Sequence, residues 1–457
     1  MTSSAKNPLA DDRRPTRVLV IVPAFNAGDT TRGIEIARAI RTVADQRRHT
    51  AEIEFIYPFT TQSFDAQIRA AGFAAEGIDL GLTDTEVAAI MRADHDGTEF
   101  ITDPERATDI IEALVTQLRH RRPDLVVYGF LPPAGIAAQI VGIPSVTYVP
   151  FPVYRPWVQH YFLQDVPDEI ALPGLAKAPQ RPRRRIARAL SGLVVLTGFF
   201  RQPTLAAAGR DLGWRTHRPH LFGMLDADVQ LVNDLPGNYT DQEVGPRTRI
   251  AGPLFSRSGD QSVPTPIAEH FAAGPTPRVF VSMGSSGERP YLLAAIEAVS
   301  AIPCRAVVVV PPHVCSLDEA REHLHGVGDV LLTDAFVPAP AVNALADVAI
   351  IHGGQGTVQT AAQAGTPVHG VGMQREQCAN IDRLVERGSA IRIPRRQWEA
   401  VAVEAALRDL IDIPSYAESA AAVATEMAQT DGYQITGDLV WDLLEAHAPN
   451  VAENCVS

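Results

Sequence analysis

Apolar runs alternate with amphipathic segments along most of the chain. Residues 17–22 form a short run rich in valine, leucine and isoleucine, which predicts a strand buried on both faces of a sheet. In residues 33–44 the apolar side chains recur at three- and four-residue spacing, which predicts a helix. Because strands that alternate with helices are typical of parallel sheets, this opening predicts an α/β fold.

The same alternation continues to residue 149 and begins again at residue 278, so we predict one α/β architecture used twice. A stretch rich in proline, glycine, serine and threonine separates the halves and predicts a linker. The predicted organisation is a tail at 1–16, a first domain at 17–234, a linker at 235–277, a second domain at 278–430 and a final segment at 431–457. Further predicted strands are 52–57, 124–128, 143–149, 278–282, 305–310, 329–333 and 348–351, with others near Val368 and Ile391, and further predicted helices are 108–119, 134–141, 291–299 and 433–446.

Charge and composition exclude several classes of protein. The formal net charge of -13 argues against nucleic acid as a partner, because phosphate-binding surfaces need a basic excess. No apolar run reaches the roughly 18 residues of a membrane span, and residues 1–14 lack the apolar core of a signal peptide. We therefore expect a cytoplasmic protein. The four cysteines form no Cys-x-x-Cys pair, so we expect neither a zinc site nor a disulfide framework.

One Gly-rich segment indicates a binding site for an anion. An apolar strand at 348–351 runs into His352-Gly353-Gly354-Gln355-Gly356-Thr357, and a helix is predicted to follow. Glycines let a backbone approach a phosphate closely, and the free N–H groups of a first helical turn point at such an anion. A tight turn without a ligand is the alternative. The segment lies late in the chain and is not Gly-x-Gly-x-x-Gly, so a nicotinamide site is disfavoured.

Residues downstream favour the ligand-binding alternative. Gly365-Thr366-Pro367 precedes a predicted strand, and Glu376-Gln377-x-x-Asn380 follows it, where a carboxylate and a carboxamide suit sugar hydroxyls. Together with His352–Thr357, these motifs resemble the donor-binding signature of family 1 glycosyltransferases, which use UDP- or TDP-sugars. Weaker resemblances are Val281–Ser286, Phe336–Pro338 and Ala251–Leu254.

The resemblance implies two facing Rossmann-like domains, the GT-B fold, with the last helix crossing back to the first domain. It implies an inverting, metal-independent transfer from a nucleotide sugar to a small-molecule acceptor, with no bound cofactor and no metal. The residues it assigns to the donor diphosphate are Ser285, His352, Gly353, Gly354, Gly356 and Thr357, those for the base are Phe336 and Val337, and those for the sugar are Glu376 and Gln377.

The chain departs from the family where the general base is expected. Alignment of the first helix places Asp29 at the family's histidine, and no carboxylate lies near Tyr128–Phe130, where the acidic partner of that histidine would fall. Three interpretations stay open: Asp29 is the base, the acceptor needs little deprotonation, or the chain is catalytically weak. A helix N-cap is the structural alternative for Asp29.

Several other side chains have competing interpretations. Asp94-His95-Asp96 and Asp226-Ala-Asp228 have the spacing of a metal-binding Asp-x-Asp, although we expect solvated loops or caps. The run Arg181–Arg185 is expected to be a solvated, mobile charge run rather than a contact with an anionic membrane or an acidic acceptor. Candidates for the acceptor pocket are Phe25, Tyr154, Trp157 and His160, with core packing or a structural histidine as the alternative.

The function predicted from these observations is transfer of a sugar to a small molecule, most readily a natural product. Two rival functions stay open: a non-catalytic subunit that binds nucleotide sugar and activates a partner, and a nucleotide-sugar epimerase or hydrolase. A nicotinamide-dependent oxidoreductase is a more distant rival. Neither the sugar, the base, the acceptor nor the oligomeric state follows from the sequence.

Overall fold

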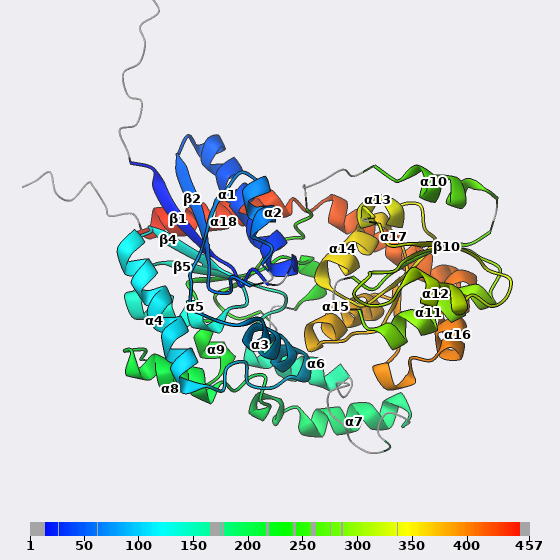
Figure 1. Ribbon diagram of the computed structural model, residues 1–457, viewed down its shortest axis with the longest axis horizontal. Coiled ribbons are helices and arrows are strands. Elements are labelled where there is room, and N and C mark those ends of the chain that lie inside the picture. The colour runs from blue at the N-terminus through cyan, green and yellow to red at the C-terminus, as the bar shows by residue number, and fades with distance from the viewer. Residues whose placement is uncertain are drawn as a thin grey trace, which may run out of the picture.

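The protein folds into two α/β domains that lie side by side (Figure 1). The N-terminal domain occupies the blue and cyan side of the ribbon, and the C-terminal domain occupies the yellow and orange side. This computed structural model describes residues 14–25, 27–61, 63–164, 174, 178–215, 219–240, 244–256, 262–274, 276–284, 287–335 and 337–447.

Within the described residues, a seven-stranded parallel sheet forms the centre of the N-terminal domain, in the order β3-β2-β1-β4-β5-β6-β7. Its middle strands are rich in valine, leucine and isoleucine because helices cover both faces of the sheet. The strands are β1 (Thr16–Ile21), β2 (Ala51–Tyr57), β3 (Ala74–Gly77), β4 (Leu125–Tyr128), β5 (Ser145–Val149), β6 (Val229–Val232) and β7 (Thr248–Ile250).

The C-terminal domain repeats this architecture with six parallel strands among the described residues, in the order β10-β9-β8-β11-β12-β13. Two Rossmann-like domains of the GT-B fold, as predicted, are therefore confirmed. The strands are β8 (Arg278–Ser282), β9 (Arg305–Val309), β10 (Asp329–Thr333), β11 (Val348–Ile351), β12 (Val368–Gly370) and β13 (Ala390–Arg392).

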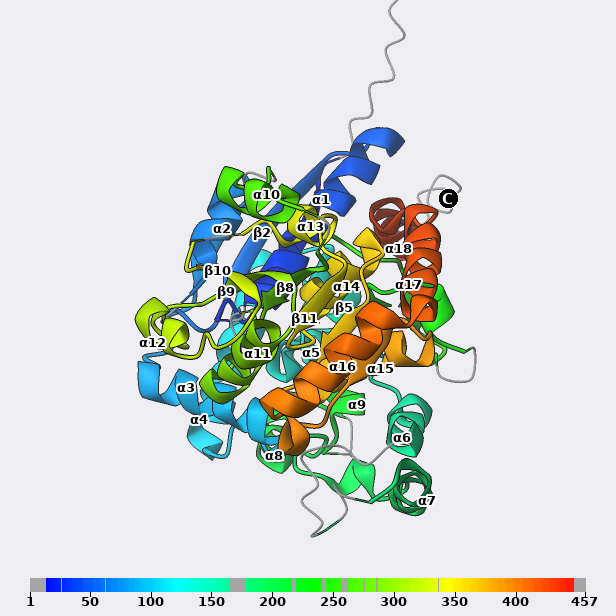
Figure 2. The ribbon, with the colours of Figure 1, turned by 90° about the vertical axis from the view of Figure 1, so that its right-hand side faces the viewer.

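Helices flank both sheets (Figures 1 and 2). Those of the N-terminal half are α1 (Ala27–Arg47), α2 (Asp65–Ala70), α3 (Asp84–Asp96), α4 (Pro104–Arg121), α5 (Pro132–Val141), α6 (Arg155–Gln164), α7 (Gln180–Leu190), α8 (Pro203–Asp211) and α9 (Leu221–Met224). Those of the C-terminal half are α10 (Thr265–Ala272), α11 (Arg289–Ala301), α12 (Leu317–Glu322), α13 (Ala339–Asn343), α14 (Gln355–Ala364), α15 (Arg375–Glu386), α16 (Ala400–Asp412), α17 (Pro414–Ala428) and α18 (Gly432–His447). Short 3-10 turns are η2 (Val194–Leu196), η3 (Pro236–Asn238) and η4 (Arg395–Gln397).

The strand order reverses once in each sheet, and these two points position the site. In the first sheet the reversal lies between β1 and β4, and in the second it lies between β8 and β11. Connections leave a reversal point in opposite directions, so a crevice opens at the carboxyl ends of the two strands, where ligands of such folds bind. The loops after β1, β8 and β11 all emerge at these crevices.

The last helix belongs in space to the N-terminal domain. α18 packs along α1, and the indole Nε1 of Trp441 donates a hydrogen bond to the carbonyl of Ile40 at 2.9 Å. A carbon at the Cβ position of Gly437 would lie 2.7 Å from the carbonyl oxygen of Ala39, so glycine permits this close approach. Arg47 extends the contact with ion pairs to Asp438, Asp442 and Glu445.

The structure corrects two details of the predicted organisation. The stretch 235–277, predicted as a linker, contains β7 of the first sheet and α10, whose Ile267 and Phe271 pack into the second domain. The run Arg181–Arg185, predicted as a mobile segment, lies in α7. The first stretch is rich in proline and the second in charged residues. Neither composition predicts a helix or a strand, and the short elements found there are stabilised by tertiary packing.

Candidate active site

The Gly-rich loop after β11 needs its glycines for conformation and for space. Gly353 has φ of +86°, and an added Cβ would lie 2.6 Å from the carbonyl oxygen of Gln377. Gly354 is the N-cap of α14 and offers no side-chain cap. The first turn of α14 therefore takes its acceptors from outside the helix: the backbone N–H of Gln355 bonds the carboxylate of Glu376, and the following N–H groups favour an anion.

His352 lies at the base of this loop, against the loop that follows β8. An added Cβ on Gly284, which has φ of +58°, would lie 2.3 Å from Cε1 of His352. The imidazole is 6% exposed, and burial lowers the pKa of His352 to about 4, although the backbone of Ser282 opposes this shift. At neutral pH the ring is therefore uncharged, and it can donate one N–H but adds no positive charge to the site.

In the first turn of α14, Gly356 leaves open space, whereas the hydroxyl of Thr357 already makes a hydrogen bond. A Cβ added to Gly356 would meet nothing within 4 Å, so this face of the helix is open. Thr357 Oγ1 donates to the carbonyl of Gly354 at 2.7 Å. Thr357 therefore holds the turn in this structure, and the diphosphate contact expected for its hydroxyl stays a prediction.

Glu376 lies beside this turn, in the first turn of α15. Its Oε1 accepts a hydrogen bond from Nδ2 of Asn380 at 2.8 Å, and the same Nδ2 donates to the carbonyl of Gly353 at 3.1 Å. Burial raises the pKa of the Glu376 carboxyl, and nearby Asp29 adds to this effect. Arg32, Asn380 and the backbone of Gln355 act in the opposite direction. The carboxylate is thus fixed at the N-terminal end of α14.

Gln377 has a different role from its neighbour. It is 2% exposed, its Oε1 accepts from the backbone N of Met373 at 2.8 Å, and its Nε2 donates to Oε1 of Gln374 at 3.0 Å. These bonds make it part of the capping box of α15. Its buried amide makes Glu376 the better candidate to contact a sugar, and the sugar contact expected for Gln377 stays a prediction.

Asp29 faces Glu376 from the other domain. It is the third residue of α1 and lies within the first turn, so the alternative interpretation as an N-cap is wrong. The side chain is 14% exposed, and its Oδ1 is 3.7 Å from Nη1 of Arg32. Burial raises the pKa of Asp29, and Arg32 opposes the shift. An acid in the first turn is also favoured by the helix dipole.

Asp94 is the third carboxylate of this cluster, and sequence reasoning placed it in a solvated loop or cap. It lies in the last turn of α3, and its Oδ2 accepts a hydrogen bond from Nε2 of Gln374 at 2.9 Å. Burial raises the pKa of Asp94 to about 7, with further contributions from Glu376 and Asp29, whereas Arg375 opposes the shift. A carboxyl with a strongly raised pKa at the contact between two domains is a candidate for a functional site.

An aromatic cluster lies beside these carboxylates. Phe100, Phe130 and Phe199 contact one another with ring centroids 5.7–6.2 Å apart. The guanidinium of Arg375 lies 5.4 Å from the ring centre of Phe199, and it also approaches Gly97, the C-cap of α3. No sequence motif marks these phenylalanines, because each comes from a different segment of the N-terminal domain.

The four predicted acceptor-pocket residues do not form one pocket. Phe25 packs on Phe59 with centroids 5.0 Å apart, in the loop between β1 and α1. Trp157 is 2% exposed and lies between Phe151 and Tyr161, which fits the core-packing alternative. Tyr154 lines a separate hollow of about 410 Å³ with residues of α9 and the segment before β7. His160 is half-buried on α6.

Two of the residues assigned to the donor, Ser285 and Phe336, lie outside the described residues. Val337 is half-buried and packs against the cluster that contains Phe280 and Val342, so its backbone lies beside the second sheet. The predicted contact of Val337 with a base stays a prediction.

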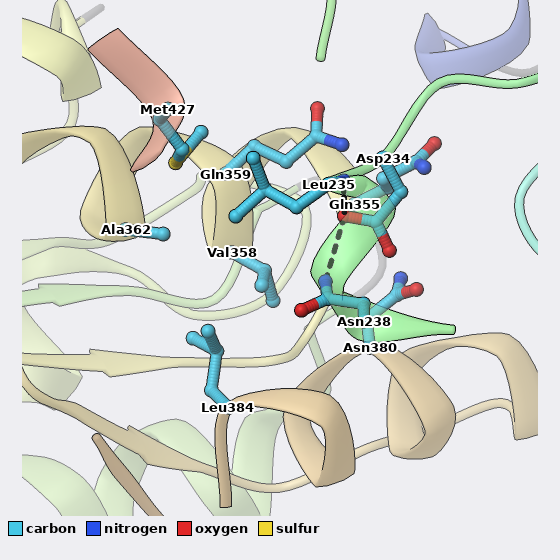
Figure 3. Close-up of a pocket in the computed structure, with 10 residues that line it drawn as sticks. All are labelled: Asp234, Leu235, Asn238, Gln355, Val358, Gln359, Ala362, Asn380, Leu384 and Met427. Carbon is cyan, nitrogen blue, oxygen red and sulfur yellow. Dashed lines mark hydrogen bonds between the residues drawn. The ribbon is translucent and has the colours of Figure 1, made fainter. Parts of the chain in front are cut away.

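The domains also meet behind the Gly-rich loop (Figure 3). Nε2 of Gln355 and Nε2 of Gln359 both donate to the carbonyl of Asn233, at 3.1 and 2.6 Å. A narrow crevice of about 20 Å³ separates α14 and α15 from η3, and Asp234 and Asn238 line it. Gln355 of the motif therefore points to the domain interface and not to the open face of α14.

The two Asp-x-Asp motifs differ from a metal site. Asp226 pairs with Arg247 at 2.8 Å, and Oδ2 of Asp228 accepts from the backbone N of Ser145 at 2.8 Å. The described part of the chain holds no group of three or more histidine, cysteine or acidic residues arranged for a metal ion. In that same part, no helix is long and apolar enough to cross a membrane.

Comparison with known proteins agrees with this architecture. Residues 307–439 match the family model of the erythromycin biosynthesis protein CIII-like C-terminal domain. A PGL/p-HBAD biosynthesis rhamnosyltransferase of Mycobacterium bovis (strain BCG / Pasteur 1173P2) is 26% identical over 324 residues, which cover 69% of this chain and 66% of the relative. A PGL/p-HBAD biosynthesis glycosyltransferase of Mycobacterium tuberculosis (strain ATCC 25177 / H37Ra) is 24% identical over 213 residues, 47% of this chain. This match spans 46% of that relative's length.

Among solved structures, the glycosyltransferase VinC in complex with DTDP superposes with a TM-score of 0.63. The two chains are 19% identical, and the superposition covers 94% of this chain and 100% of VinC. The superposition shows that this chain has the GT-B fold. Its C-terminal half matches the CIII-like domain model, and the curated relatives it resembles are named as glycosyltransferases.

Proposed function

We propose that this chain is an inverting glycosyltransferase that moves a sugar from a UDP- or TDP-sugar to a small-molecule acceptor, without a metal ion. The observation that carries the proposal is the meeting of two unlike groups at one domain interface. The N-terminus of α14 comes from one domain, and the carboxylates of Asp29 and Asp94 come from the other. Such an interface suits an anionic leaving group on one side and a proton acceptor on the other.

The donor half of the cleft would hold the nucleotide diphosphate. First-turn N–H groups of α14 and one N–H of the neutral His352 ring would donate to its oxygens, and they would stabilise the charge that develops as the diphosphate leaves. Glu376, held by Asn380, would accept hydrogen bonds from sugar hydroxyls. The VinC complex with DTDP supports a TDP-linked sugar for this site.

The acceptor half would supply the base. Asp29 is paired with Arg32, whereas Asp94 lies among carboxylates and is half-protonated near neutral pH. A base whose pKa lies near the working pH combines availability with proton affinity, so we assign proton abstraction to Asp94. Asp29 and Arg32 would then orient Glu376 and the acceptor. The cluster of Phe100, Phe130 and Phe199 offers an apolar wall to an aglycone.

Nucleotide binding is the first test. Gly356→Val places a branched side chain where the protein has open space, so the fold should tolerate it while a diphosphate at α14 is displaced. We expect calorimetry to show micromolar binding of TDP or UDP, weaker binding of GDP, and at least a tenfold loss of affinity in Gly356→Val. Gly192→Val is the matched control, since Gly192 also has no atom within 4 Å of an added Cβ.

Two results would overturn parts of the proposal. If no nucleotide binds, or if Gly356→Val binds as wild type does, the donor site is not at α14. Incubation with a TDP-sugar and no acceptor separates the rival functions: rapid release of free sugar indicates a hydrolase, and a changed sugar on the nucleotide indicates an epimerase. Tight binding without turnover on any acceptor would favour a non-catalytic subunit.

A further inference from the structure

The charge of the chain is strongly uneven. Although the formal net charge is -13, the stretch between Glu169 and Asp211 contains eight basic residues and no acidic residue. Five of the eight are arginines within residues 181–188, and they lie on α7. Figures 1 and 2 both show α7 at the bottom of the molecule, on its outer edge. This helix thus carries a local positive charge on an otherwise acidic protein.

Exposed apolar side chains gather at the same place. In the described part of the chain, eight large apolar side chains are exposed, and three of them lie within residues 186–196. Ile186 is 36% exposed, Leu193 is 55% exposed and Leu196 is 57% exposed. Single exposed leucines are ordinary, but such a concentration beside five arginines is not expected of a surface that only meets water.

The segment is anchored, so these side chains are presented on a formed surface. Ala187, Val194 and Val195 are buried, and Val194 and Val195 join the core of the N-terminal domain. α7 packs against α6, and backbone hydrogen bonds from Leu193 to Leu190 and from Leu196 to Leu193 continue the turns after the helix. We define the α7 patch as Arg181, Arg184, Arg185, Ile186, Arg188, Leu193 and Leu196.

We propose that the α7 patch is a docking surface for an anionic lipid bilayer, on which the protein lies as a peripheral protein. Arginines at the rim of such a surface pair with lipid phosphates, and neighbouring leucines enter the boundary between headgroups and acyl chains. A nucleic acid or an acidic protein would satisfy the arginines, but it would leave Leu193 and Leu196 without an apolar partner. The mixture of basic and apolar side chains therefore favours the bilayer.

Docking at this patch is independent of the proposed sugar transfer, and it would give the protein a fixed orientation. α7 and α6 belong to the N-terminal domain, which carries Asp94 and the aromatic cluster. A protein docked through α7 would hold this domain against the membrane. Because α6 packs between α7 and the domain core, docking need not obstruct the loop at α14.

Vesicle sedimentation of the full chain tests the proposal. We expect binding to phosphatidylcholine vesicles that contain phosphatidylglycerol, little binding to phosphatidylcholine alone, and weakening by salt. The triple variant R181S/R185S/R188S should lower the partition coefficient at least roughly tenfold, and L193S/L196S should lower it several-fold. Matched controls are R119S/R321S/R408S, with the same charge change on three other helices, and V327S/V401S, which replaces two other exposed valines.

An unchanged circular dichroism spectrum and an unchanged Tm in every variant show that the fold is intact, and this control does not depend on the donor site. Absence of binding to phosphatidylglycerol vesicles overturns the proposal. An equal loss of vesicle binding in the control variants also overturns the proposal, because binding would then depend on net charge and not on the α7 patch. Binding to duplex DNA as strong as binding to vesicles, unaffected by L193S/L196S, would identify the α7 patch as a general polyanion surface and overturn the assignment to a bilayer.

Discussion

Gln374 of the C-terminal domain donates a hydrogen bond from its side-chain amide to Asp94 of the N-terminal domain, over 2.9 Å. This bond joins the N-cap of α15 to the last turn of α3, so it spans the cleft where we place the reaction. It also means that Asp94 reaches its full environment only when the domains are together. The carboxyl that we assign as base is therefore completed by the domain that holds the donor.

Asp94→Asn should lower kcat about 10²- to 10⁴-fold, because general base catalysis contributes an effect of this size. An asparagine can still accept the bond from Gln374, so TDP affinity should change little. Steady-state kinetics with a productive acceptor measure kcat, and calorimetry measures the affinity. Asp96→Asn is the matched control, since Asp96 is exposed in the same helix turn. Equal activity of the two variants would exclude Asp94 as the base.

The pH dependence of kcat/KM, which reports the unliganded protein, should show an acidic limb near the pKa of Asp94, about 7. Only the ionised carboxyl accepts a proton, so activity falls as pH falls through this value. Glu376 takes no part in the hydrogen bond between Gln374 and Asp94, yet its charge raises the pKa of Asp94. Glu376→Gln should therefore move the acidic limb to lower pH. A limb that stays in place would show that the two carboxyls do not interact.

Asp94 should also make the protein less stable at alkaline pH. Its pKa is raised from 3.8 to about 7 on folding, so between these values the folded state binds the proton that the unfolded state has lost. Stability from this group is thus present at low pH and decreases as pH rises to about 7. Asp94→Asn removes this loss of stability, which at about 1.4 kcal/mol per pKa unit amounts to a few kcal/mol. We expect a higher Tm for the variant at pH 8 and a smaller difference at pH 4.

Gly284→Ala should disturb the donor loop through His352. The added Cβ would lie 2.3 Å from the imidazole, and φ of +58° adds backbone strain, so we expect a loss of stability of about 1–3 kcal/mol. TDP affinity should fall with it because the ring must move. Gly142→Ala is the control: Gly142 has φ of +77° but no atom within 4 Å of an added Cβ. Urea denaturation measures the loss of stability, and calorimetry measures TDP affinity. A loss of stability without a loss of TDP affinity would indicate strain alone, without displacement of His352.

Much of the fold could be predicted from local pattern. The predicted strands at 278–282, 329–333 and 348–351 coincide with β8, β10 and β11, because strands buried on both faces leave a continuous apolar run. The loop at His352 was recognisable for a similar reason, since glycines and a helix start are local features. Short strands such as β6 and β7 were missed, because their pairing is decided by neighbours distant in the chain.

The acceptor half of the site could not be predicted in this way. Asp94 and Gln374 are 280 residues apart, and nothing near Asp94 in the sequence indicates that it is buried. A polar segment at a helix end is usually solvated, which is why Asp94 was assigned to a loop or cap. Burial raises the pKa of Asp94, with further contributions from two carboxylates on other elements, so only the tertiary structure reveals the shift.

The chain crosses between its domains near residue 252 and again near residue 432, and the two crossings touch. A Cβ added to Gly432 would lie 2.2 Å from the carbonyl oxygen of Pro253, and one added to Gly252 would lie 3.0 Å from Cα of Gly432. Two covalent tethers that meet at one place act as a single pivot. A change in the angle between the domains about this point would therefore change the spacing between the donor loop and the base.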